Sequence, residues 1–213
     1  MQNPANTAFE AAVARGCHVI RDGDNAMVID GAFARLSDPC SDSSGFTIDP
    51  DIAMIRGPVP AIDALGARLG WRRVFEGHEM IWRGGGTDDP RCVSSATLDH
   101  PLWRREFIAE AFATGGTPPE VPRDRMFVWC DPEPRAMAGI IPLSDDVTRI
   151  VLVYTPPEFR GRGYAGALVG ALAHRARTTV SLDVSVDNPA GLRAYERVGF
   201  VRVGRQAIWL KLE

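Results

Sequence analysis

The pattern of apolar residues is clearest between residues 150 and 176. From position 164 onward, each apolar residue is followed by another three or four positions later, which places them on one face of a helix. They are Ala165, Leu168, Val169, Leu172, Ala173 and Ala176. A shorter apolar run, Ile150 to Tyr154, lies upstream and stops before Pro156 and Pro157, which cannot continue a strand ladder. The pattern predicts a strand that ends at the two prolines, followed by a helix with one buried face.

The rest of the chain shows the same two kinds of pattern, bounded by glycine, proline, asparagine or aspartate. We expect helices at 8–16, 60–69, 100–114 and 189–198. We expect strands at 26–30, 31–36, 52–56, 71–75, 79–82, 126–130, 135–141, 149–154, 179–186, 200–203 and 207–212. Short, turn-like connections join the three strands between residues 126 and 154, which predicts an antiparallel meander.

A turn rich in arginine and glycine joins the strand to the helix. Gly161 and Gly163 would let a phosphate approach the backbone without meeting a Cβ, and Arg160 and Arg162 would neutralise its charge. The first N–H groups of a helix have no partner inside the helix, and the helix dipole adds partial positive charge there. The turn is therefore a candidate anion site, suited to a phosphate of any kind.

The sequence divides at a polar, glycine-rich stretch, residues 84–90. We therefore expect an N-terminal region over residues 1–90 and a second domain over residues 91–213. A chain of 213 residues is long enough for one large domain or two small ones, each with a proper core.

An internal similarity links the two parts of the chain. Residues 60–74 align without gaps with residues 189–203, and each segment precedes two strand-like runs. Two explanations stay open: chance similarity between two helices that feed strands, or a worn partial copy of the C-terminal fold in the N-terminal region. Such a copy would not be catalytic, because Gly66 takes the place of Tyr195 and no arginine–glycine turn precedes it.

Composition excludes several classes of partner. The net charge is −3 at pH 7, so neither a nucleic acid nor an anionic membrane surface is an expected partner. No apolar run is long enough to span a membrane, and the N-terminus lacks the pattern of a signal peptide. The cysteines are far apart, which favours free thiols in a reducing cytoplasm over disulfides or a metal site. They are Cys17, Cys40, Cys92 and Cys130.

Two motifs together resemble the GCN5-related N-acetyltransferase (GNAT) family. The turn Arg160-Gly-Arg-Gly-Tyr-Ala165 fits its (Arg/Gln)-x-x-Gly-x-(Gly/Ala) pattern. The segment from Asn188 through Tyr195 to Phe200 fits its second signature at the usual separation. The residues around the turn are most similar to the FR47-like branch, and the resemblance covers about residues 95–213. It implies an α/β (α+β) fold with a mixed, mostly antiparallel central sheet flanked by helices.

The resemblance implies that acetyl-CoA is the cosubstrate and that no metal takes part. Val153 and Thr155 would pair with the pantetheine arm, and a backbone N–H near Tyr154 would polarise the thioester carbonyl. Asn188 would also hydrogen-bond the pantetheine arm, although its role as helix cap explains it equally well. The pyrophosphate would be held by the backbone of Arg160, Gly161, Arg162, Gly163, Tyr164 and Ala165.

The implied reaction is direct transfer of an acetyl group from the CoA thioester to a primary amine. Tyr195 would protonate the leaving thiolate, and the alternative is a ring that packs under the sheet together with Leu192. Asp183 would accept the amine proton, and the alternative is a solvated carboxylate on a strand face. Glu106 and Glu110 belong to the helix that shapes the acceptor side in relatives, and could instead recognise a cationic acceptor.

Two other functions stay open at this point. A non-catalytic acyl-CoA-binding regulatory module would share the donor motif, with the N-terminal region covering the acceptor groove. Nucleotide binding is disfavoured, because neither a P-loop nor a GxGxxG pattern occurs at the strand–helix turn. The identity of the amine, the length of the acyl group and the oligomeric state are left open, a homodimer being one option.

Overall fold

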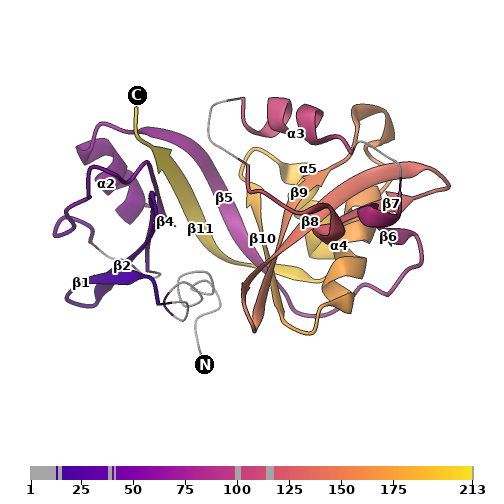
Figure 1. Cartoon of the computed structure of the whole chain (residues 1–213), viewed down its shortest axis with the longest axis horizontal. Coiled ribbons are helices and arrows are strands. Elements are labelled where there is room, and N and C mark those ends of the chain that lie inside the picture. The colour runs from indigo at the N-terminus through magenta and orange to yellow at the C-terminus, as the bar shows by residue number, and fades with distance from the viewer. Residues whose placement is uncertain are drawn as a thin grey trace. The chain divides into compact units, whose positions relative to one another are not determined.

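The structure is a computed structural model that describes residues 13, 16–37, 40, 42–98, 102–113 and 118–212. The chain forms two compact units. Unit 1 comprises Met1–Glu79, Ser185–Asp187 and Arg202–Glu213, and unit 2 comprises Met80–Val184 and Asn188–Val201. Two long strands, β5 (Arg72–Trp82) and β11 (Phe200–Leu210), contribute residues to both (Figure 1). Neither unit is one continuous stretch of sequence, and a partial copy of the fold in residues 1–90 stays a prediction.

Unit 1 is built on strands that pack against one helix. Its elements are β1 (His18–Asp22), β2 (Asn25–Asp30), β3 (Phe33–Leu36), β4 (Met54–Pro58) and α2 (Ala61–Arg68), with parts of β5 and β11. The first three strands are antiparallel neighbours. β4 pairs in parallel with β3 and antiparallel with the last part of β11. The core lies between α2 and the strands, where Ile55, Ile62 and Leu65 are fully buried.

Gly66 has a packing role in the core of unit 1. A Cβ at this position would overlap the Trp209 indole, so only glycine lets α2 approach the ring this closely. The Trp209 Nε1 donates a hydrogen bond to Asp63 Oδ1 at 2.8 Å, one helical turn away from Gly66. The small residue at position 66 therefore has a physical explanation in unit 1 itself.

Unit 2 holds the other described α-helices and the other strands, apart from Ser185 at the end of β10. They are β6 (Cys92–Ser94), α3 (Arg104–Ala111), β7 (Met126–Cys130), β8 (Pro134–Ser144), β9 (Val147–Tyr154), α4 (Tyr164–Arg175), β10 (Thr179–Ser185) and α5 (Pro189–Arg197). The predicted meander is confirmed, because β7, β8 and β9 pair antiparallel in order. β6 pairs antiparallel with β7, whereas β10 pairs in parallel with β9, so the strands are mixed and mostly antiparallel. Among the described helices, none is long and apolar enough to cross a membrane.

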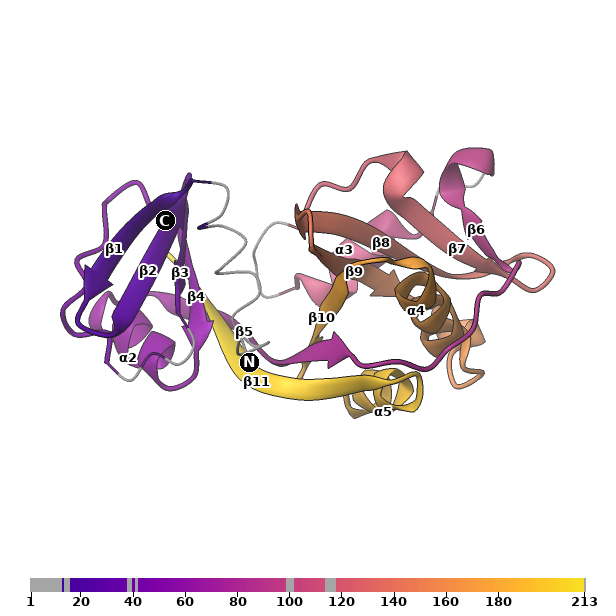
Figure 2. The same ribbon diagram turned by 90° about the horizontal axis from the view of Figure 1, so that it is seen from below.

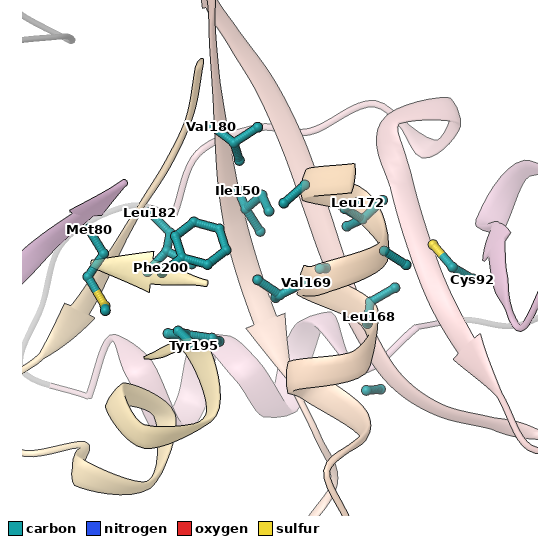
Figure 3. Packing of buried hydrophobic residues seen from close by; sticks show 14 of the residues in the cluster. Met80, Cys92, Ile150, Leu168, Val169, Leu172, Val180, Leu182, Tyr195 and Phe200 are labelled. Atoms are coloured by element: carbon teal, nitrogen blue, oxygen red, sulfur yellow. The ribbon is translucent and has the colours of Figure 1, made fainter. Parts of the chain in front are cut away.

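The strands of unit 2 have helices on both faces (Figures 1 and 2). On one face, α4 and α5 enclose a core that includes Leu168, Val169 and Leu172, the residues whose spacing predicted the helix (Figure 3). On the other face, α3 packs its Trp103 and Phe107 side chains against a second apolar cluster. The strands thus present different surfaces to the two sides.

Several predicted elements differ from the observed ones. The strands predicted at 71–75 and 79–82 are one strand, β5, and those at 200–203 and 207–212 are one strand, β11. Strand pairing, which the local sequence does not display, carries the backbone past Gly77 and Gly204. The prediction missed β1 and β6. The helix predicted at 100–114 is described from Arg104 to Ala111. Residues 100, 101 and 114, and most of the helix predicted at 8–16, lie outside the described residues.

The glycine-rich stretch at 84–90 packs tightly within unit 2. A Cβ at Gly199 would overlap the carbonyl group of Gly84, so at this point backbone meets backbone. A Cβ at Gly86 would lie 2.8 Å from the carbonyl oxygen of Gly170, in the middle of α4. The glycines of this stretch therefore allow it to run directly against α4 and the end of α5.

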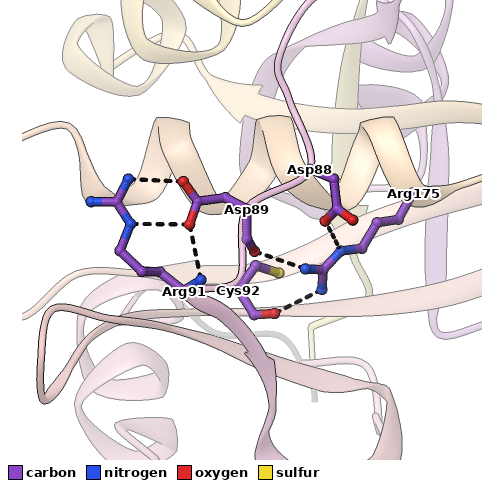
Figure 4. Close-up of polar contacts among 5 residues, drawn as sticks. All are labelled: Asp88, Asp89, Arg91, Cys92 and Arg175. Atoms are coloured by element: carbon purple, nitrogen blue, oxygen red, sulfur yellow. Dashed lines mark hydrogen bonds and ion pairs between the residues drawn. The ribbon is translucent and has the colours of Figure 1, made fainter.

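Arg175, at the end of α4, hydrogen-bonds the acidic end of the glycine-rich stretch 84–90 and the residues just after it (Figure 4). Its Nε donates to Asp88 Oδ1 at 2.5 Å, and its two Nη atoms donate to the carbonyl oxygens of Cys92 and Asp89 at 2.7 and 2.8 Å. Arg91 hydrogen-bonds the Asp89 carboxylate and lowers the pKa of that group to about 2. Residues 84–92 are thus held against α4 at several points along their length.

Candidate active site

β9 and β10 are hydrogen-bonded over only part of their length. Among the described residues, their pairs run from Val147–Thr179 to Arg149–Ser181, and both strands then continue, to Tyr154 and Ser185. Backbone groups beyond the last pair are therefore available to another extended molecule, in the manner of an added strand. The predicted pantetheine site at Val153, Tyr154 and Thr155 lies at this end of β9.

A β-bulge distorts the end of β9. Gly139 of β8 pairs with Val151 and Met137 pairs with Tyr154, so between these pairs one residue of β8 faces two of β9. Leu152, inside this bulge, has a φ of 53°, a left-handed conformation that leucine rarely adopts. Bulges bend a strand and leave a residue outside the ladder, here at Leu152 and Val153, whereas Tyr154 is paired with β8 again.

The turn before α4 has the geometry of an anion site. Gly161 and Gly163 have φ angles of 78° and 84°, and a Cβ at either position would meet no atom within 4 Å. Gly163 is the N-cap of α4 and supplies no side-chain acceptor to the first helical N–H groups. Arg162 is exposed, whereas Tyr164 and Ala165 are half-buried in the first turn of the helix. The open space in front of the turn borders unsatisfied N–H donors, which fits a pyrophosphate.

The Arg160 side chain turns back toward β9. Its Nε donates to the carbonyl oxygen of Thr155 at 2.9 Å, and its Nη2 donates to Glu110 Oε2 of α3 at 2.6 Å. The guanidinium lies 5.5 Å from the ring centroid of Tyr154. The hydrogen bond to Glu110 raises the pKa of Arg160 further, and burial raises the pKa of Tyr154. Arg160 thus engages the carbonyl of Thr155, one of the residues predicted to pair with pantetheine.

The Thr155 hydroxyl is a polar atom that fits a ligand. Within the described chain its Oγ1 is buried and has no hydrogen-bond partner. A buried hydroxyl without a partner costs free energy, and such atoms in native proteins often face a ligand or water. Its place directly after β9, beside the open turn, is where the pantetheine arm of acetyl-CoA was predicted.

α4 and α5 run side by side in the same direction. A Cβ at Gly166 would lie 3.3 Å from the carbonyl oxygen of Ala194, and one at Gly170 would lie 3.1 Å from Val198 Cβ. Because both contact pairs advance by four residues, the two helices are parallel, and their N-terminal ends lie on the same side. The turn before α4 and the start of α5 therefore lie at the same end of the two helices.

Asn188 caps α5, as predicted. Its Oδ1 accepts a hydrogen bond from the backbone N–H of Gly191 at 2.8 Å. A Cβ at Gly191 would lie 2.7 Å from Asn188 Nδ2, so glycine there leaves room for the amide. Capping uses the oxygen of the amide, and a ligand role would use its Nδ2 donors.

Tyr195 lies on the inner face of α5, next to the residue that contacts the first turn of α4 (Figure 3). Its ring is 7% exposed and its centroid is 6.3 Å from that of Phe200. Burial raises the pKa of the Tyr195 phenol, so it keeps its proton across the neutral range. The ring packs in the core, as the packing hypothesis for Tyr195 predicted. The role of Tyr195 as an acid stays a prediction.

Asp183 forms an ion pair that the sequence did not indicate. Arg149 Nη1 donates to Asp183 Oδ2 at 2.9 Å, and the Arg149 side chain is only 8% exposed. Arg149 Nε also donates to Ser181 Oγ at 3.4 Å, so the pair sits where the β9–β10 ladder ends. A base at Asp183 would have to share its carboxylate with Arg149, and this role stays a prediction.

Two contacts of the site could not be found by sequence reasoning. Glu110 and Arg160 are 50 residues apart, and no local pattern links them. Arg149 lies in a strand whose apolar neighbours dominate the pattern, so its burial beside Asp183 gave no signal. Both contacts depend on which strands and helices become neighbours.

Two strands whose pairing ends early, a glycine turn and a helix without a side-chain cap together suit an extended, anionic cosubstrate. The model of the Acetyltransferase (GNAT) family matches residues 93–200, slightly more than half of the chain. The chain therefore belongs to the GNAT family. It is an N-acetyltransferase, and the acyl group comes from CoA, with acetyl-CoA as the cosubstrate that the family uses.

Solved structures with the same fold span nearly the whole chain. A GCN5-related N-acetyltransferase from Kribbella flavida has a TM-score of 0.55 at 15% identity, covering 98% of this chain and 95% of that one. A GNAT-family protein from Novosphingobium aromaticivorans has a TM-score of 0.53 at 21% identity, covering 98% of each chain. No curated protein matches the sequence. At these identities the similarity shows the fold alone.

Proposed function

We propose that the chain transfers an acetyl group from acetyl-CoA directly to a primary amine. The observation that carries this proposal is the end of the β9–β10 ladder beside the open turn before α4. The pyrophosphate would lie against the N–H groups from Arg160 to Ala165. The pantetheine arm would extend from there along Val153 to Thr155, in reach of the unpartnered Thr155 hydroxyl.

The backbone at the β9 bulge would stabilise the transition state. Attack by the amine nitrogen on the thioester carbon puts negative charge on the carbonyl oxygen, before the C–S bond breaks. An N–H group near Tyr154, at the bulge that Leu152 and Val153 form, could donate to this oxygen. Such a donor supplies on the order of 3 kcal/mol in known enzymes. This contribution needs only backbone geometry.

Two side chains would transfer protons during the reaction, one as acceptor and one as donor. The amine must lose a proton before or during attack, and Asp183, held by Arg149, is the proposed acceptor. The CoA thiolate must gain a proton, and the Tyr195 hydroxyl is the proposed donor. In sum, a protonated amine gives up two protons, of which the thiolate gains one and the solvent the other, and the acetyl group moves from sulfur to nitrogen. Membership of the FR47-like branch, a cytoplasmic location and a homodimeric state stay predictions.

Release of free CoA thiol with a panel of amines tests the proposed function. The panel should include amino acids, polyamines, an aminoglycoside and a peptide with a free N-terminus, each with saturating acetyl-CoA. We expect at least one amine to raise thiol release well above the rate without amine. Tight acetyl-CoA binding with no amine-dependent release would favour the non-catalytic binding module instead.

Asn188→Ser separates capping from ligand binding at the start of α5. Serine caps helices about as well as asparagine, so the melting temperature should change little. Serine lacks the amide donors, and losing one hydrogen bond of about 1 kcal/mol should weaken acetyl-CoA binding about fivefold. Calorimetric titration measures the affinity. An affinity equal to that of the wild type would leave Asn188 with the capping role alone.

A further inference from the structure

We propose that Glu110 competes with acetyl-CoA for the Arg160 guanidinium, so that donor binding releases α3 from the end of β9. This inference rests on the proposed donor site at the turn. Arg160 Nη2 donates to Glu110 Oε2 at 2.6 Å, and Arg160 Nε donates to the Thr155 carbonyl oxygen. One side chain thus joins the anion-binding turn, the end of β9 and α3.

α3 is weakly attached to unit 2. None of its eight residues is buried, and its apolar contacts come from half-buried side chains such as Phe107. The Phe107 ring meets the Tyr154 ring edge-on, with centroids 6.3 Å apart. A helix with few buried contacts opens at low free-energy cost, so a single polar contact changes its docking measurably. The Glu110–Arg160 pair is such a contact.

A phosphate is a stronger partner for Arg160 than Glu110 is. The two side chains of the pair are 44% and 54% exposed, and exposed pairs of this kind change an equilibrium constant by about fivefold at most. A pyrophosphate brings more negative charge and can bind a guanidinium at two points. On this proposal Arg160 turns from Glu110 toward a phosphate that lies in the open space before Gly163. Donor binding therefore breaks the pair.

Release of α3 would uncover the reacting end of the site. Phe107 rests on Tyr154, and Glu110 reaches the turn over Thr155 through Arg160. These are the residues beside which the thioester is proposed to lie. An acceptor would thus gain access up to about fivefold more often once acetyl-CoA has taken Arg160 from Glu110. By thermodynamic reciprocity, a docked α3 weakens donor binding by the same factor by which the donor weakens docking.

Glu110→Gln removes the charge that holds Arg160, and Glu106→Gln is the matched control. Glu106 lies one turn earlier on the same exposed side of α3, so both variants lose one negative charge. Acetyl-CoA affinity is measured by calorimetry, and amide hydrogen exchange is measured over Arg104–Ala111 with and without acetyl-CoA. We expect E110Q to bind acetyl-CoA two- to fivefold more tightly than E106Q. In wild type, acetyl-CoA should speed exchange in α3 by a similar factor, whereas E110Q should exchange fast already without it.

The outcomes separate this proposal from the donor site on which it rests. Equal affinities for E110Q and E106Q, or slower α3 exchange when acetyl-CoA binds, would overturn the competition while the donor site stands. If wild-type protein binds no acetyl-CoA, or binds it equally well after Gly163→Val, the donor site is wrong and the competition with it.

Discussion

Gly163→Val is expected to raise the dissociation constant for acetyl-CoA at least a hundredfold, with the fold retained. Gly163 has a φ of 84°, and valine in this conformation is strained by on the order of 1–2 kcal/mol. Its Cβ would meet no protein atom within 4 Å, so it would instead occupy the space proposed for the pyrophosphate. The loss corresponds to about 3 kcal/mol of binding free energy, the contribution of several phosphate contacts.

Gly70→Val is the matched control for backbone strain. Gly70 has a φ of 67° and also faces open space, but it follows α2 in unit 1. It should therefore lose a similar amount of stability in thermal unfolding and bind acetyl-CoA as the wild type does. Calorimetric titration of both variants decides the point: equal affinities for G163V and G70V would show that the turn does not hold the donor.

Tyr195→Phe is expected to lower turnover about a hundredfold, while acetyl-CoA affinity and thermal stability change little. Phenylalanine keeps the ring that packs against Phe200, so only the hydroxyl is lost. A positioned general acid typically contributes a hundredfold or more to the rate. Steady-state kinetics with an active amine measures the change. Turnover equal to the wild type would leave Tyr195 with a packing role only.

The pH dependence of wild-type turnover checks the same assignment. Tyr195 must be protonated to act as an acid, and burial raises its pKa above the ordinary value of about 10. The acid form is therefore present at neutral and mildly alkaline pH and is lost only above that value. The assignment would be contradicted if, as pH rises, wild-type turnover already falls before pH 9 and the phenylalanine variant shows no such fall.

Local sequence patterns were enough to predict the helices and strands around the arginine–glycine turn. The spacing of Leu168, Val169 and Leu172 predicted α4, and the three strands before it paired as the meander predicted. The Asn188 cap was also predicted, because capping involves residues only three apart. In each case the interactions that decide the structure are close in sequence.

Features that depend on distant partners could not be predicted. β5 and β11 continue through glycines that resemble turn residues, because neighbouring strands hold them extended. The left-handed Leu152 follows from the register between β8 and β9, which the sequence of neither strand displays. The ion pair between Arg149 and Asp183 likewise requires β9 and β10 to lie side by side.

The course of β11 prevents the catalytic part of this chain from being excised as a single segment. Phe200, at its start, is buried in the core of unit 2, whereas Ala207 and Trp209, near its end, pack in the core of unit 1. A fragment that begins at residue 91 would keep the last part of β11 but lose β4, its antiparallel neighbour. The apolar side chains on the last part of β11 would then face water, which favours aggregation of the fragment.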